Sequence, residues 1–154
     1  MTNAEILAAI RDGAMTEMTP AHIRHLRLAD TLRLVSFEPG LARAAWTPSE
    51  DFAIPGPGGF IFGGYVAAVT DAVAHFCMLT FLDDGRLYST ADLRLSYFRP
   101  FTERHYDAEA RLVTRTRTQA HVEVSFLNQA GAMAAKGTLM QRMREGDAPP
   151  RARA

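Results

Sequence analysis

The stretch that decides the fold is FGGYVAAVTDAVAHFCMLTFL, residues 62–82. It opens on Gly63 and Gly64 and continues with almost wholly apolar residues. A glycine pair at a helix start lets a ligand approach bare backbone N–H groups. Asp71 lies seven residues after Gly64, and a carboxylate among apolar side chains is costly unless it has a partner or a function. The stretch therefore predicts a long core helix over 65–82 that carries a buried carboxylate.

The composition is that of one soluble domain. The chain has 154 residues, 47% hydrophobic residues, 22% charged residues and no net charge, which gives no support for nucleic-acid binding. The first residues lack the basic-then-apolar order of a signal peptide. Asp71 and His75, near the middle of the apolar stretch, disfavour a membrane span. We therefore expect a cytoplasmic protein with no nucleic-acid or membrane partner.

Metal and disulfide chemistry is not expected. The single cysteine, Cys77, excludes an intramolecular disulfide and a multi-cysteine metal site. His22 and His25 have the spacing of neighbours on a helix, but no other residue nearby completes a ligand set. We therefore assign them to a solvated surface and predict no metal site.

The order of predicted elements indicates an α+β fold. An N-terminal segment, 1–30, contains a helix over Ala4–Arg11 capped by Asn3. Strands over Thr31–Glu38 and Leu41–Thr47 flank a type II turn at Pro39-Gly40. After the long helix, four stretches alternate apolar and polar residues, as in half-buried antiparallel strands. They lie over 90–97, 107–112, 121–126 and 133–143, and the first alternates Ala91, Leu93, Leu95 and Tyr97 with Thr90, Asp92, Arg94 and Ser96.

Such an apolar helix must be covered on most sides. We therefore predict a sheet of five or six antiparallel strands wrapped around one central helix. The predicted domain spans 31–143, and a disordered tail is expected over 144–154.

At this point the sequence resembles the hotdog-fold acyl-CoA thioesterases, particularly the phenylacetate-pathway type. Their pattern is His-Gly-Gly, an Asp nine positions after the His, and then a strand of the form Thr-x-Asp that ends in Arg-Pro. The matching residues are Phe62-Gly63-Gly64, Asp71, Thr90-Ala91-Asp92 and Tyr97-Phe98-Arg99-Pro100. The resemblance covers roughly residues 30 to 143.

The resemblance implies roles for individual residues. The Gly64 N–H would receive the thioester oxygen, Asp71 would act as nucleophile or general base, and Thr90 would help to hold the attacking water. Phe62 replaces the family histidine and cannot make the hydrogen bond that orients the site. Residues expected to contact substrate are Phe62, Gly63, Tyr65, His75 and Arg99. No cofactor is implied, because CoA is part of the substrate.

Helix geometry adds an argument for a dimer. Seven residues correspond to about 10 Å of helix rise, too far for one thioester to touch both Gly64 and Asp71 of the same chain. If both act on one carbonyl, the second group comes from another copy, which predicts a homodimer with two equivalent sites. The family also shows such dimers, and a homotetramer is a further possibility.

Several interpretations stay open. The glycine pair taken alone fits a tight turn, and Asp71 could be a structural carboxylate bonded to His75 one turn away. The leading hypothesis is an acyl-CoA thioesterase that releases free acid and CoA. The alternatives are a hotdog hydratase or dehydratase, in which His75 would be catalytic, and a non-catalytic dimer that binds acyl-CoA.

Overall fold

The computed structural model describes residues 1–13 and 24–144. The predictions for His22 and for the tail beyond Arg144 lie outside these residues. The elements in chain order are α1 (Asn3–Arg11), α3 (Leu28–Thr31), β1 (Leu32–Glu38), β2 (Leu41–Trp46), a 3-10 turn (Glu50–Phe52), α4 (Gly63–Leu79), β3 (Leu87–Tyr97), β4 (Tyr106–Arg115), β5 (Gln119–Leu127) and β6 (Met133–Arg144).

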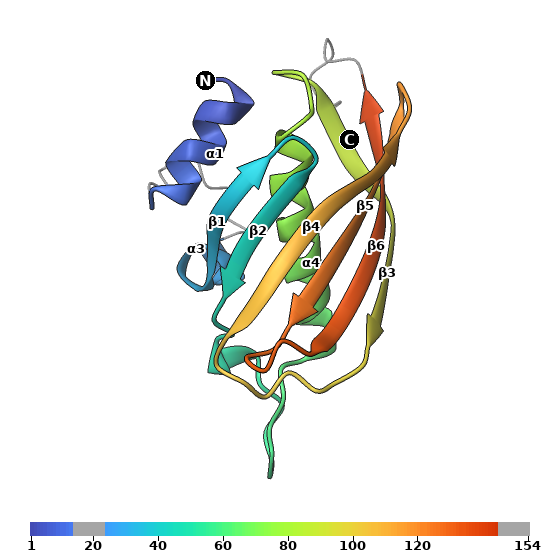
Figure 1. Ribbon diagram of the computed structural model, residues 1–154. Helices are drawn as coiled ribbons and strands as arrows, with labels where there is room; N and C mark the ends of the chain where they lie inside the picture. The colour runs from blue at the N-terminus through green and yellow to red at the C-terminus, as the bar shows by residue number, and fades with distance from the viewer. Residues whose placement is uncertain (14–23, 145–154) are drawn as a thin grey trace, which may run out of the picture.

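A six-stranded antiparallel sheet curves around α4 (Figure 1). The strand order is β1-β2-β4-β5-β6-β3, so β1 and β3 form the two edges. The predicted α+β arrangement, a sheet wrapped around one long helix, is confirmed. The turn between β1 and β2 also agrees with the prediction, because Gly40 has the positive φ of 77° that a type II turn requires.

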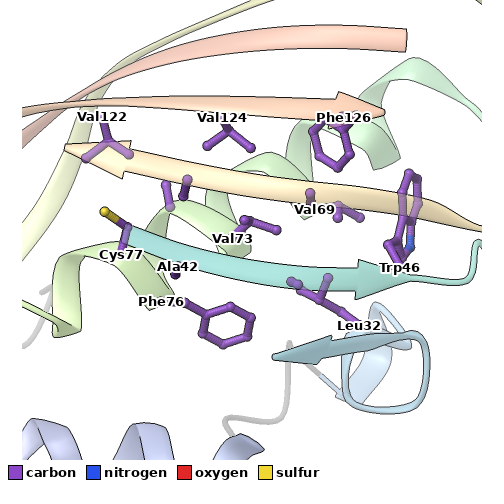
Figure 2. Close-up of a cluster of buried hydrophobic side chains, with 14 of the residues drawn as sticks. Leu32, Ala42, Trp46, Val69, Val73, Phe76, Cys77, Val122, Val124 and Phe126 are labelled. Atoms are coloured by element: carbon purple, nitrogen blue, oxygen red, sulfur yellow. The ribbon is translucent and has the colours of Figure 1, made fainter. Parts of the chain in front are cut away.

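The core fills the space between α4 and the concave face of the sheet. Val69, Val73 and Cys77 of α4 are fully buried against side chains of β2, β4, β5 and β6 (Figure 2). Trp46 is also fully buried and contacts the rings of Tyr65, Phe101, Tyr106 and Phe126. Burial raises the pKa of the Cys77 thiol to about 12, so Cys77 acts as a small apolar core residue.

Helix α1 packs against β1 (Figure 1). Its residue Leu7 is buried. The prediction that Asn3 caps this helix is wrong, because Thr2 and Glu5 form a capping box instead. Asn3 is the first helical residue, and its side-chain amide donates to the carbonyl of Leu82 at 2.8 Å. Asn3 thus ties α1 to the segment that follows α4.

A β-bulge in β3 changes which side chains face the helix. Thr90 pairs with Gln141 of β6, and Asp92 pairs with the adjacent Met140, which leaves Ala91 as the extra residue. Strict alternation predicted Thr90 on the opposite face from Leu93. The bulge shifts the phase by one residue, so both face α4. The prediction that Thr90 and Leu93 lie on opposite faces is therefore wrong. With the bulge in place, the Thr90 hydroxyl faces the helix.

Gly137 of β6 sets how closely the sheet approaches α4. A Cβ atom built on Gly137 would lie 2.7 Å from Cγ2 of Thr70, whose rotamer is held by a 2.7 Å hydrogen bond to the carbonyl of Val66. We expect Gly137→Ala to lower the free energy of unfolding by about 1–3 kcal/mol through overpacking. Urea denaturation measures this loss, with Gly131→Ala as a comparison at an open turn, where the positive φ strains the backbone instead. An unchanged midpoint for Gly137→Ala would show that the helix can move away from the sheet freely.

Candidate active site

One side of α4 is left open by the sheet. Gly64, Asp71 and His75 are exposed, and Ala67 and Ala68 are partly exposed; we call these five residues the open stripe. They recur three or four residues apart, which places them on one side of the helix. The prediction that Asp71 is buried is therefore wrong for the single chain, because the sheet covers the other sides of α4 and stops short of this one.

Asp71 has a hydroxyl partner from the sheet. Thr90 Oγ1 lies 2.7 Å from Asp71 Oδ1 and donates to it. The same hydroxyl lies 3.0 Å from the side-chain amide oxygen of Gln141. The two residues that the sequence assigned to catalysis alongside Gly64 are thus in direct contact.

His75 bonds to Tyr88 rather than to Asp71. Its Nδ1 is hydrogen-bonded to the Tyr88 hydroxyl, and the two rings stack with centroids 5.8 Å apart. The surrounding protein lowers the pKa of His75, although part of the ring is accessible, and the Asp71 carboxylate acts in the opposite direction. Burial likewise raises the pKa of Tyr88. The contacts therefore do not support a structural Asp71–His75 pair.

The start of α4 carries backbone donors that the helix itself does not use. Gly63 and Gly64 are the first two helical residues, and the first four N–H groups of a helix have no acceptor within it. Phe62 precedes them and is 55% exposed. Its ring lies so close to Gly64 that a Cβ atom there would be 2.6 Å from Phe62 Cε1. Glycine at this position leaves room for the Phe62 ring.

An apolar groove of about 400 Å³ adjoins the helix start. Its lining residues are Phe60, Ile61, Gly63, Tyr97, Phe98, Arg99, Pro100 and Phe101. The Tyr97 hydroxyl donates to the Gly63 carbonyl at 2.5 Å, and Arg99 Nη1 donates to the Met133 carbonyl at 2.5 Å. The groove thus combines an apolar wall with one cation beside the free N–H groups.

Tyr65 is separated from the other predicted substrate-contacting residues. It is buried on the core side of α4, its ring stacks on Phe52 at 3.8 Å, and its hydroxyl donates to the Leu26 carbonyl at 2.8 Å. Burial raises the pKa of Tyr65. The remaining residues form two groups, one at the helix start with Phe62, Gly63, Gly64 and Arg99, and one about two turns along with Asp71, His75 and Thr90.

Sequence reasoning missed Tyr88, Gln141 and the role of Tyr97. Tyr88 can be placed on the inner face of β3 only after the bulge is known, because it precedes the bulge and shares the face of Thr90. Tyr97 follows the bulge and lies on the predicted face with Leu93, but its hydrogen bond to Gly63 was not predicted. Gln141 stands among apolar residues near the end of β6, and a polar residue at an inward position was the available signal.

No group of three or more potential metal ligands occurs in residues 1–13 and 24–144. In the same part of the chain, the helices fall short of the length and apolar content that a membrane span needs.

The comparison with protein families decides the classification. The thioesterase superfamily matches residues 58–135, just over half of the chain, including the helix start, Asp71 and Thr90. The chain belongs to the thioesterase superfamily. The match also covers the whole of α4 and β3, so it rests on the elements that carry both groups of site residues.

Solved structures agree on the fold. AziG of S. sahachiroi is 25% identical with a TM-score of 0.69, and the match covers 80% of this chain and 95% of AziG. A phenylacetic acid degradation-related protein of Ralstonia eutropha JMP134 is 24% identical with a TM-score of 0.72, covering 88% and 98%. A Streptococcus mutans protein bound to acetyl CoA is 22% identical with a TM-score of 0.66, covering 75% and 90%. The fold of this chain is the hotdog fold. A search of curated proteins finds no match.

Proposed function

We propose that this protein is an acyl-CoA thioesterase that hydrolyses a thioester to a free acid and CoA. The observation that carries the proposal is the hydrogen bond from Thr90 of β3 to Asp71. Asp71 lies on the open stripe of α4, which also includes Gly64 at the start of the helix. Membership of the thioesterase superfamily supports the reaction class. The neighbour bound to acetyl CoA supports acyl-CoA as the form of the substrate.

In the proposed reaction, the Gly64 N–H and the helix dipole stabilise the negative charge that develops on the thioester oxygen. Asp71 takes a proton from water while the water oxygen bonds to the carbonyl carbon. The C–S bond then breaks, and the CoA thiolate leaves and takes up a proton. Alternatively Asp71 attacks first and water cleaves the resulting anhydride. Both routes use only water and side chains, so we propose that no cofactor is needed.

We propose that each site is shared between two copies of the chain. Gly64 and Asp71 lie about 10 Å apart along one helix, so one thioester cannot reach both in a single copy. Within the described parts of the chain, no strand pairs with the outer edge of β3. Leu87 and Tyr97 near its two ends are about half exposed. A second copy at this edge would cover the open stripe and bury Asp71, as the sequence led us to expect.

The proposed substrate lies in the apolar groove at the helix start. Phe60 and Phe98 are exposed there, which suits an acyl chain or the pantetheine arm of CoA. The Arg99 guanidinium suits an anionic group of CoA. We also propose that residues 31–143 form the hydrolytic domain, to which the segment 1–30 adds α1 against β1. The structure extends the last strand one residue further, to Arg144.

The test is a thiol-release assay with acyl-CoAs of increasing chain length and with aromatic acyl groups, combined with identification of the product. Release of CoA together with the free acid supports the proposal. Binding of acyl-CoA without release would identify a non-catalytic binder, and water addition across an unsaturated acyl group would identify a hydratase. Sedimentation at micromolar concentration should give a dimer or a dimer of dimers, and a monomer would contradict the shared site.

A further inference from the structure

Gln141 is one of two buried polar residues in the described chain, and it belongs to the neighbourhood of the catalytic pair. It is 1% exposed and lies on β6 directly opposite Thr90 of β3. The other buried polar residue, Thr70, bonds to its own helix through the Val66 carbonyl. Burying an amide side chain is costly unless it is hydrogen-bonded. A glutamine at this inward position therefore needs a reason.

The hydrogen bonds around Thr90 are inconsistent when the amide oxygen of Gln141 faces it. Thr90 has one hydroxyl proton, yet two acceptors face it: Asp71 Oδ1 at 2.7 Å and Gln141 Oε1 at 3.0 Å. At the same time, the Gln141 amide nitrogen is buried without a partner. A half-turn of the amide exchanges its oxygen and nitrogen without moving other atoms. The amide then donates to the Thr90 oxygen, and the Thr90 proton has a single acceptor.

We propose that Gln141 is a positioning residue whose amide donates to Thr90 and thereby commits the Thr90 hydroxyl proton to Asp71. The hydrogen bonds then run in one direction, from Gln141 through Thr90 to the carboxylate. Thr90 engages only Oδ1 of Asp71, which leaves the second carboxylate oxygen to accept a proton from water. The proposal rests on the proposed function, because it assigns Asp71 the role of base or nucleophile.

The location of Gln141 fits this role. Its backbone lies between β5, where it pairs with Ala120, and β3, where it pairs with Thr90. The bulge at Ala91 begins immediately after Thr90. Gln141 therefore supports Thr90 at the point where the strand changes phase. Without its amide, the Thr90 hydroxyl could rotate away from Asp71 at little cost.

The test is a double-mutant cycle in the thioesterase assay, with Gln141→Met and Thr90→Val made singly and together. Methionine keeps the length of glutamine and removes the amide oxygen and the amide NH₂ group. We expect Gln141→Met to lower kcat about fivefold with little change in KM, as loss of one hydrogen bond implies. In the Thr90→Val background, the same change should alter kcat by less than about 1.5-fold. An equal loss in both backgrounds, or no loss in either, would overturn the proposal.

Two further measurements separate positioning from folding and from the proposed function. Gln119→Met on β5 is the matched control, because the Gln119 side chain bonds neither Thr90 nor Asp71 in the described chain, and it should leave kcat unchanged. In ¹⁵N-labelled protein, the Gln141 side-chain amide should exchange slowly, and its signals should shift in Thr90→Val. Unshifted signals would overturn the proposed hydrogen bond from the Gln141 amide to the Thr90 hydroxyl. If the signals shift but the protein cleaves no thioester, the proposed function is rejected, while the hydrogen bond from Gln141 to Thr90 remains supported.

Discussion

Replacement of Asp71 by asparagine is expected to lower kcat for thioester hydrolysis by about 10²- to 10⁴-fold. Asparagine has nearly the shape of aspartate and can still accept the hydrogen bond from Thr90, so the geometry of the pair is retained. It cannot take a proton from water at neutral pH, and it is a poor nucleophile. The effect should therefore appear in kcat, with KM changed by less than about threefold.

Asp92→Asn is the matched control. Asp92 lies two residues beyond Thr90, on the outer face of β3, where it pairs with Arg94 at 3.0 Å. Such exposed pairs contribute little to stability. In the described chain no hydrogen bond or ion pair joins Asp92 to α4, so this variant should retain full activity. Thermal unfolding should show that both variants fold. Comparable hydrolysis by Asp71→Asn and the wild type would remove Asp71 from the mechanism.

Removal of the Gly64 N–H is expected to lower kcat by about 10²- to 10³-fold, as measured when oxyanion-hole donors are removed. Gly64→Pro deletes this donor, and proline is tolerated in the first turn of a helix. Any side chain at position 64 would meet the Phe62 ring, so the comparison is best made in a Phe62→Ala background. There, Gly64→Ala keeps the N–H and controls for the added carbon. Equal activity of the proline and alanine variants would exclude an oxyanion role for this N–H.

The two variants together test whether the site is shared. Asp71→Asn and Gly64→Pro chains can be mixed, unfolded and refolded as mixed dimers. If one chain supplies the donor and the other the carboxylate, half of the dimers are mixed and each contains one intact site. The mixture should then recover about a quarter of the wild-type specific activity. If both groups come from one chain, every site carries a defect and the mixture stays inactive.

The long helix and the strands could be predicted because their signals are local. The apolar run of α4 and the Pro39-Gly40 turn depend on residues adjacent in sequence. The exposure of Asp71 could not be predicted from that run, because it depends on where a distant sheet ends. Helix α4 carries apolar residues on almost every side. Its sequence therefore does not distinguish the side that the sheet covers from the side that a second copy would cover.

The contacts of the candidate site depend on how the residues of β3 are paired with those of β6. The alternation in β3 was detected, but its phase before Leu93 was wrong because a bulge leaves no clear mark in a sequence. Thr90 was therefore identified through the resemblance to a family and not through its pattern. Gln141 was missed because its importance depends on its cross-strand neighbour Thr90, beside the bulge, and through Thr90 on Asp71 of the helix.

The extra residue in β3 has a consequence for how such a site can vary. Deleting Ala91 would keep Thr90 opposite Gln141 and Leu93 opposite Leu139, because Ala91 is the residue that the pairing with β6 leaves out. The bulge thus absorbs one additional residue while the Thr90 hydroxyl stays at Asp71. Within this sheet, one residue can be gained or lost at the bulge in evolution without turning Thr90 away from the helix.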